Sequence, residues 1–207
     1  MSCDQMSTEN EEPDEALLKT AWSLDDPGKI QELIECGADV HYTDPDTGDT
    51  PLIKSCSKGY INNVKLLLEK GADVEAKNDE GMTSLMFASL SGHLGTLQYL
   101  HRNGAQIETK NNNGWSSIQF ASWSGHLETV KYLHENGAHI EENINGKTSM
   151  MLASLIGCLE VVQYLHQKGA DVDAKDHYGQ NSLMYATFGK SSFRKSHWIT
   201  RKERKKI

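Results

Sequence analysis

The sequence predicts an all-α solenoid, in which helix-turn-helix units with hairpin-like loops are stacked on one another. The dipeptide Gly-Ala returns five times in 207 residues, with steps of 34, 33, 33 and 32. A second glycine opens a G-x-[T/S/N]-[P/S]-apolar phrase and returns with steps of 33, 33, 32 and 33. Two independent markers with one period indicate a repeat architecture, whose units bury their apolar faces against their neighbours. The Gly-Ala glycines are Gly37, Gly71, Gly104, Gly137 and Gly169, and the second glycines are Gly48, Gly81, Gly114, Gly146 and Gly179.

Each unit contains two apolar pairs with helical spacing. One pair stands 19 and 16 residues before the Gly-Ala glycine, as Leu85 and Ala88 do, and the other stands seven and four residues before it, as Leu97 and Leu100 do. Residues three positions apart share one face of a helix, so each pair marks the buried face of one helix. Between the pairs, a glycine in left-handed conformation would end the first helix. These mid-unit glycines are Gly59, Gly92, Gly125 and Gly157.

The first helix of a unit has a recognisable start. Thr50, Thr83, Ser116 and Thr148 precede the apolar position by two, and such hydroxyls are good N-caps. Pro51 follows the first of them at the opening helical position, where a missing N–H costs nothing. The polar segments between units, such as residues 73–81, are rich in turn formers and predict protruding loops.

This pattern resembles the ankyrin repeat, which has a 33-residue period, a β-turn plus two helices and a T-P-L-H-x-A phrase. The resemblance runs from about Asp14 to Gly189, in units of about 14–47, 48–80, 81–113, 114–145 and 146–178 and a partial sixth unit of 179–189. The histidine of the phrase is absent throughout. Because the resemblance gives this histidine a role in hydrogen bonds between repeats, we expect an array less rigid than a consensus one. Its place is taken by Ile53, Met86, Gln119, Met151 and Met184.

Both ends depart from the repeat. Residues 14–47 keep the apolar positions but have an Asp-Asp-Pro sequence where the mid-unit glycine stands elsewhere, which predicts a capping unit whose outer face tolerates water. The sixth unit has no recognisable second-helix phrase. Residues 1–13 form an acidic segment that we predict to be disordered, and residues 190–207 form a basic tail with eight Lys or Arg and one Glu.

Composition and motifs exclude several classes of function. The mean hydropathy is −0.58, and no run approaches the ~18 apolar residues of a membrane span, so we expect no membrane insertion. The four cysteines lie far apart without a CxxC pair, which fits neither a disulfide framework nor a structural zinc site. The chain has no P-loop, no G-x-G-x-x-G after a strand, no G-x-S-x-G and no H-E-x-x-H. We therefore expect a monomer without catalysis, metal or cofactor.

Histidine is abundant, with nine residues, and most positions are explained by the repeat. His93 and His126 follow mid-unit glycines, where we expect a structural role. His101, His134 and His166 recur at one position three residues before a Gly-Ala. Equivalent side chains in stacked helices are ~8–10 Å apart, whereas zinc ligands lie ~2.0–2.1 Å from the metal. A structural ladder is therefore favoured, with metal binding or pH sensing as the alternative.

The basic tail has three interpretations. It could be a nuclear-localisation or nucleic-acid-binding patch, it could contact the acidic body of its own chain, or it could be solvated without a partner. Nucleic-acid binding is expected of no other part of the chain. We expect the protein in the cytoplasm, with the nucleus left open by the tail. The residues that would form the import signal are Arg201, Lys202, Arg204, Lys205 and Lys206.

The surface that the repeat leaves free is the predicted site. A curved array presents an extended concave surface, and the ankyrin resemblance implies that partners contact the loop tips and the exposed ends of the first helices. Trp115 at a loop tip and Trp123 near a helix end are predicted to be exposed anchors within a polar rim, the usual anatomy of an interface hot spot. The alternative is that one or both rings fold back onto a neighbouring repeat. The predicted protein-binding residues are Asp79, Glu80, Met82, Leu90, Asn112, Asn113, Trp115, Trp123, Lys147, Leu155, Ile156, His177 and Tyr178.

The function predicted from these observations is a non-catalytic protein–protein interaction module, acting as an adaptor, scaffold or inhibitor through its concave face and loop tips. The alternatives are a regulatory ankyrin fragment of a larger signalling protein and a nuclear factor that uses the basic tail.

Overall fold

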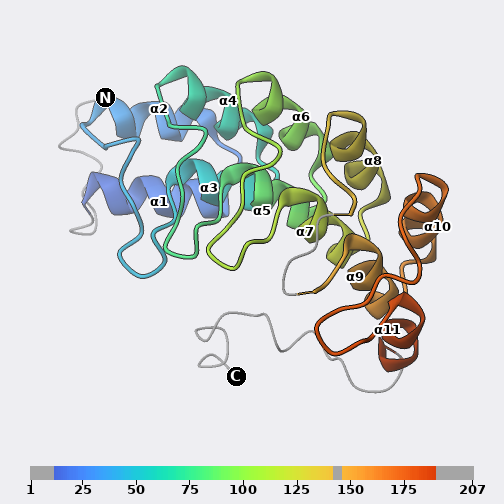
Figure 1. The fold of residues 1–207 in the computed structure, drawn as a ribbon. Helices are drawn as coiled ribbons and strands as arrows, with labels where there is room; N and C mark the ends of the chain where they lie inside the picture. Colours follow the sequence, from blue (N-terminus) through green and yellow to red (C-terminus); the bar gives the residue numbers. More distant parts are fainter. Residues whose placement is uncertain (1–11, 142–145, 190–207) are drawn as a thin grey trace.

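The computed structural model describes residues 12–141 and 146–189, which form eleven helices in two rows (Figure 1). The first helices of successive units stack side by side, and the second helices form an outer row. The predicted all-α solenoid of helix-turn-helix units is confirmed. The first row contains α1 (Pro13–Ser23), α3 (Pro51–Lys58), α5 (Ser84–Ser91), α7 (Ser117–Ser124), α9 (Ser149–Ile156) and α11 (Ser182–Gly189). The second row contains α2 (Pro27–Glu35), α4 (Ile61–Glu69), α6 (Leu94–Arg102), α8 (Leu127–Glu135) and α10 (Leu159–Gln167).

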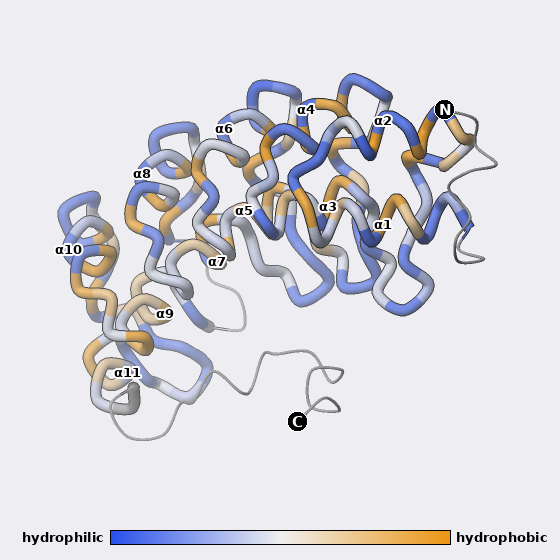
Figure 2. The backbone as a smooth tube through the Cα atoms, turned by 180° about the vertical axis from the view of Figure 1, so that it is seen from behind, coloured by the Kyte–Doolittle hydropathy of each residue, from blue (hydrophilic) through white to orange (hydrophobic). Residues whose placement is uncertain are grey.

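The core follows the seam between the two rows, where Figure 2 shows hydrophobic residues while the loops are hydrophilic. Leu85 and Ala88 of α5 and Leu97 and Leu100 of α6 are fully buried, as the apolar pairs predict. Full burial of one leucine side chain contributes roughly 1.5–3 kcal/mol. Since the other units place buried or partly buried side chains, mostly apolar, at the same positions, the core is continuous from α1 to α10.

The predicted helix starts are confirmed. The side-chain oxygens of Thr50, Thr83 and Thr148 accept hydrogen bonds from backbone N–H groups three residues later, at 3.2, 3.4 and 3.4 Å. Ser116 forms a capping box with Gln119 instead, because the Gln119 side chain also accepts the backbone N–H of Ser116 at 3.1 Å. Each cap satisfies orphan donors of a helix that is only eight residues long.

The mid-unit glycines are required for two reasons. Gly59, Gly92 and Gly125 end their helices in left-handed conformation, with φ of 73°, 74° and 76°. A Cβ on Gly92 would also lie 2.5 Å from Nδ1 of His126 in the next unit, and one on Gly59 would lie 2.6 Å from the ring of His93. Each turn is therefore covered by the side chain at one fixed position of the following unit. The structural role predicted for His93 and His126 is confirmed, and Nε2 of His126 also bonds the Leu90 carbonyl at 3.1 Å.

The histidine ladder on the second helices has tyrosine partners that the sequence analysis did not anticipate. Nδ1 of His101 lies 2.9 Å from Oη of Tyr132, and Nδ1 of His134 lies 2.9 Å from Oη of Tyr164. Both ring pairs are edge-on, with centroids 5.8 Å apart. The residues are thus links between consecutive units, as the structural interpretation expects, and His166 of the last complete unit is exposed.

Carboxylates add a second set of links between units. Glu75 accepts the backbone N–H of Gln106 at 2.9 Å, Glu108 accepts that of His139 at 3.3 Å, and Glu141 accepts that of Asp171 at 2.9 Å. Each glutamate stands four residues after a Gly-Ala glycine and reaches the same backbone position of the next unit. Gln119, at the place of the missing family histidine, donates from Nε2 to the Lys147 carbonyl at 3.4 Å.

Replacing Gly92 with alanine tests the turn geometry. The left-handed conformation and the His126 ring both oppose a Cβ, so we expect Gly92→Ala to lower the free energy of unfolding by more than ~1–2 kcal/mol. Gly95→Ala is the matched control, because Gly95 is helical and open, and should be neutral or stabilise by up to ~1 kcal/mol. Urea denaturation measures the free energy of unfolding of both variants. Equal effects of the two substitutions would contradict the requirement for glycine at this turn.

A second test concerns the pH dependence of folding. Burial lowers the pKa of His93 from its ordinary value of 6.5, a hydrogen bond to the Ser57 backbone raises it in part, and His126 lowers it further. Because the unfolded chain then binds more protons below pH 6.5, the His93 contribution to stability is complete above this pH and is lost as the pH falls through the lowered folded pKa.

We therefore expect the urea midpoint to decrease between pH 7.5 and 5.5 and the decrease to be smaller in His93→Cys. Cysteine suits this position because Cys158 occupies it in the fifth unit, against Gly125. The same pH dependence in the variant as in the wild type would show that His93 does not contribute to the pH dependence of stability.

Candidate protein-binding surface

The array curves toward the side on which the first helices and the loops lie (Figure 1). We call this surface the inner face. It consists of positions in the later turns of the first helices together with the tips of the loops that precede them. Its helix positions are Lys54, Ser57 and Lys58 in α3, Leu90 and Ser91 in α5, Trp123 and Ser124 in α7, and Leu155 and Ile156 in α9.

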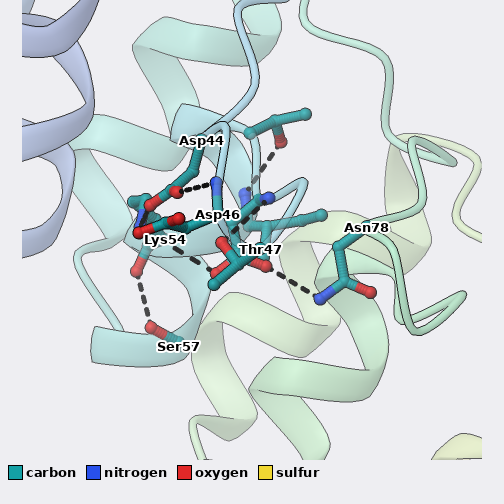
Figure 3. A network of polar contacts seen from close by, with 9 residues as sticks. Asp44, Asp46, Thr47, Lys54, Ser57 and Asn78 are labelled. Atoms are coloured by element: carbon teal, nitrogen blue, oxygen red, sulfur yellow. Dashed lines mark hydrogen bonds and ion pairs between the residues drawn. The ribbon is translucent and has the colours of Figure 1, made fainter. Parts of the chain in front are cut away.

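The inner face is polar and internally paired at its N-terminal end, as Figure 3 shows. Nζ of Lys54 lies 2.8 Å from Oδ2 of Asp44 and 3.9 Å from Oδ2 of Asp49. Asn78, in the next loop, donates to Oδ1 of Asp49 at 2.8 Å. Burial raises the pKa of Asp44, but hydrogen bonds from Lys54 and the backbone of Asp46, with the charge of Lys54, outweigh it and lower the pKa overall. These side chains are paired with one another, and their contacts join adjacent loops to each other and to α3.

Trp115 is not exposed, contrary to the prediction. Its side chain is only 9% exposed, and its ring centroid lies 5.3 Å from that of Phe120 and 6.2 Å from that of Trp123. The cause is the turn before it, where Oδ1 of Asn111 accepts the N–H groups of Asn113 and Trp115 at 3.1 and 2.8 Å. This turn directs the ring back over α7, so the ring folds back onto its own unit and not, as the alternative expected, onto a neighbouring repeat.

Two further predicted residues are buried. Met82 is 4% exposed, since its backbone N–H is held by Oδ1 of Asn78 and its sulfur accepts a hydrogen bond from Asn111 of the next loop at 3.4 Å. Leu155 is 6% exposed and packs with Met151 and Tyr185 beneath α11. The expectation that Met82 and Leu155 offer side-chain surface to a partner is wrong, because neighbouring units cover them.

The remaining predicted residues divide into two groups. Seven of these residues are open to solvent, and three are half-buried. Trp123 belongs to the second group, because it packs against the Met151 cluster of the next unit. The exposed residues are Asp79, Glu80, Asn112, Asn113, Ile156, His177 and Tyr178, and the half-buried ones are Leu90, Trp123 and Lys147. Residues 190–207, with the predicted import signal, lie outside the described residues.

Trp22 is an exposed aromatic residue that the sequence analysis missed. Its side chain is 48% exposed, and Nζ of Lys58 lies 3.6 Å and Nζ of Lys54 5.6 Å from its ring centroid. Such placement of an ammonium over an indole is a cation–π contact. The repeat register holds the signal, because Trp22 occupies a position at which other units bury a small residue, so the large ring must turn outward. These small residues are Cys56, Ser89, Ser122 and Ser154.

The described residues offer little for other chemistry. Within residues 12–141 and 146–189, no three His, Cys, Asp or Glu side chains are placed to hold a metal ion together. Burial raises the pKa of the Cys56 thiol well above its ordinary range. None of the described helices is long and apolar enough to cross a bilayer. What the inner face supplies is an extended surface with aromatic and aliphatic groups beside polar loop tips.

The fold and this surface define a repeat protein of the stacked helix-turn-helix class that presents one continuous face. A family model described as "Ankyrin repeats (3 copies)" matches residues 17–111 and 118–194, and a second, "Ankyrin repeats (many copies)", matches residues 91–134. The chain belongs to the ankyrin-repeat family, as the sequence resemblance predicts. Ankyrin repeats are protein–protein interaction modules, and this is the role that family membership gives the chain.

Similar curated proteins share only a short part of this chain. A 52-residue segment, 25% of the chain, is 44% identical to the Caenorhabditis elegans "Ankyrin repeat and KH domain-containing protein mask-1", of which it covers 2%. Segments of the same length are 44% and 42% identical to "Protein phosphatase 1 regulatory subunit 27" of Mus musculus and Homo sapiens, of which they cover 33%. The chain thus matches a third or less of the length of these relatives.

The corrected position of Trp115 leads to a stability prediction. Truncation of a buried aromatic side chain typically costs ~3–5 kcal/mol, so Trp115→Ala should lower the free energy of unfolding by about 3 kcal/mol. Ile156→Ala, at a side chain that is 40% exposed, should change it by no more than ~0.5 kcal/mol. Urea denaturation followed by circular dichroism checks both, and a Trp115→Ala midpoint equal to that of the wild type would mean that the ring is not part of the core.

Proposed function

We propose that the chain is a non-catalytic adaptor, scaffold or inhibitor that binds a protein partner on its inner face. The observation that carries this proposal is that half-buried Trp123 and exposed Ile156 lie near the ends of neighbouring first helices on the inner face, while exposed Trp22 lies beside Lys58 at the N-terminal end of this face. Tryptophan is enriched among the residues that contribute most to protein–protein binding.

The middle of the inner face is suited to be the main contact. The Trp123 ring is held edge-on to Trp115, with centroids 6.2 Å apart, and against the Met151 cluster of the next unit. A side chain that is already fixed loses little conformational entropy on binding. Ile156 lies at the end of the neighbouring first helix, and exposed Asn112 and Asn113 supply polar groups at the loop tip. An apolar centre with a polar rim is the usual composition of such interfaces.

The names of the relatives give an indication of the kind of function. Two of them are named regulatory subunits of a phosphatase, which supports a regulatory adaptor as the class to which this chain belongs. The phosphatase is not carried over, because the shared segment is 52 residues long. The alternative of a nuclear factor depends on Arg201, Lys202, Arg204, Lys205 and Lys206, and it stays a prediction from the sequence.

The proposal is tested by binding to a partner captured with the full chain by cross-linking and identified by mass spectrometry. Ile156→Asp places a charge in the predicted contact and should weaken binding about 30-fold, as loss of a hot spot worth ~2 kcal/mol does. Gln163→Asp adds the same charge on α10 in the outer row, where the side chain is exposed, and should leave the affinity unchanged. Weakening by Gln163→Asp alone would place the interface on the outer row and contradict the proposal.

A further inference from the structure

The C-terminal end of the array exposes residues that the second to fifth units bury. Leu183 of α11 is 73% exposed and Met184 is 47% exposed. Both stand in the repeat register of core residues, so their exposure comes from their place at the end of the array and not from their type. The residues equivalent to Leu183 are Leu18, Leu52, Leu85, Ile118 and Met150, and those equivalent to Met184 are Ile53, Met86, Gln119 and Met151, none more than 7% exposed.

The same loss of cover extends to α10 and the loop after it. Leu159 is 65% exposed, although Leu94 and Leu127 at its position are half-buried, and Val172 is 43% exposed, although Ile107 at its position is 8% exposed. We call Leu159, Val172, Leu183 and Met184 the end face. Figure 2 shows hydrophobic residues on α10 and α11 up to this end of the described chain.

The end face is a fixed surface. The Tyr185 ring is buried against Met151 and Leu155, and its hydroxyl donates to Oδ2 of Asp176 at 2.8 Å. Oδ1 of Asp176 accepts the backbone N–H groups of Tyr178 and Gln180, each at 2.8 Å. These contacts hold α11 on α9 and keep the neighbouring Leu183 and Met184 turned outward. Several exposed large apolar side chains at one end of an array are a feature that often marks a contact site.

We propose that residues 190–207 of the chain cover the end face. In each of the units that begin with α3, α5, α7 and α9, the helix that covers the first helix consists of the residues that directly follow the mid-unit glycine. Residues 190–207 directly follow Gly189, the last residue of α11, and they include Phe193, Trp198 and Ile199. The ankyrin family match also continues to residue 194, beyond the end of α11.

Tethering and charge favour the same occupant. A segment joined to α11 by a peptide bond has a high effective concentration at the end face, which no separate partner has. Residues 190–207 carry eight Lys or Arg and one Glu. The end face is flanked by exposed Glu160, next to Leu159, and by exposed Asp171 and Asp173 on either side of Val172. Apolar side chains can thus meet the end face while cationic side chains meet its acidic border.

Amide hydrogen exchange of the full chain, with a double-mutant cycle, tests this proposal. One variant carries Phe193→Ser with Trp198→Ser, one carries Leu183→Ser, and one combines all three. If the two sides touch, each of the first two variants should raise the exchange rates of the α11 amides about tenfold. The combined variant should raise them no further, because one contact is lost only once. Amides of α5 and α6 should keep their wild-type rates.

Leu24→Ser is the matched control, since Leu24 is 57% exposed at the opposite end of the array, and it should leave α11 exchange unchanged. Effects that multiply in the combined variant, or α11 amides that exchange at the same rate in all variants, would overturn the proposal. A second copy of the chain would be the occupant instead if α11 exchange slowed with protein concentration and sedimentation showed a dimer abolished by Leu183→Ser.

Discussion

The contact on which this structure depends is the one between the turn of one unit and a side chain of the next. The left-handed glycine at the middle of a unit brings bare backbone to the surface, and His93, His126 or Cys158 of the following unit lies against it. The contact sets the distance between units at the point where the chain reverses. The buried leucines, the histidine–tyrosine pairs and the glutamate links all require this spacing, because each joins side chains of adjacent units.

The parts of the molecule that could be predicted from the sequence are those that depend on local, repeated features of each unit. Helix caps and mid-unit glycines obey local rules that recur four times and apolar pairs a rule that recurs five times, so Thr83, Gly92 and Leu97 were placed correctly by spacing alone. Trp115 was not, because the direction of its ring depends on two hydrogen bonds to the Asn111 side chain, and residue spacing alone does not give the geometry of that turn. Leu155 was misplaced because its cover comes from Tyr185, in a unit that the repeat pattern describes only in part.

Trp22 is the opposite case, because the repeat register itself indicates that this side chain is exposed. A large ring at a position reserved for buried small residues has to leave the core, and here it meets Lys58. A residue that is too large for a buried position of the repeat therefore indicates which side chains lie on the surface. The inner face combines such residues with loop tips that the fold leaves free, while the end face arises where the repeat itself is incomplete.

The central claim is that the inner face, and not the outer row of helices, binds the partner. Site-specific photo-crosslinking tests it most directly, with a photoreactive residue placed at Ser124 or Lys58 on the inner face and at Gln98 or Glu128 on the outer row. If the inner face is the interface, one and the same protein is captured covalently from both inner positions and none is captured from the outer positions. Equal or stronger capture from Gln98 and Glu128 would contradict this claim.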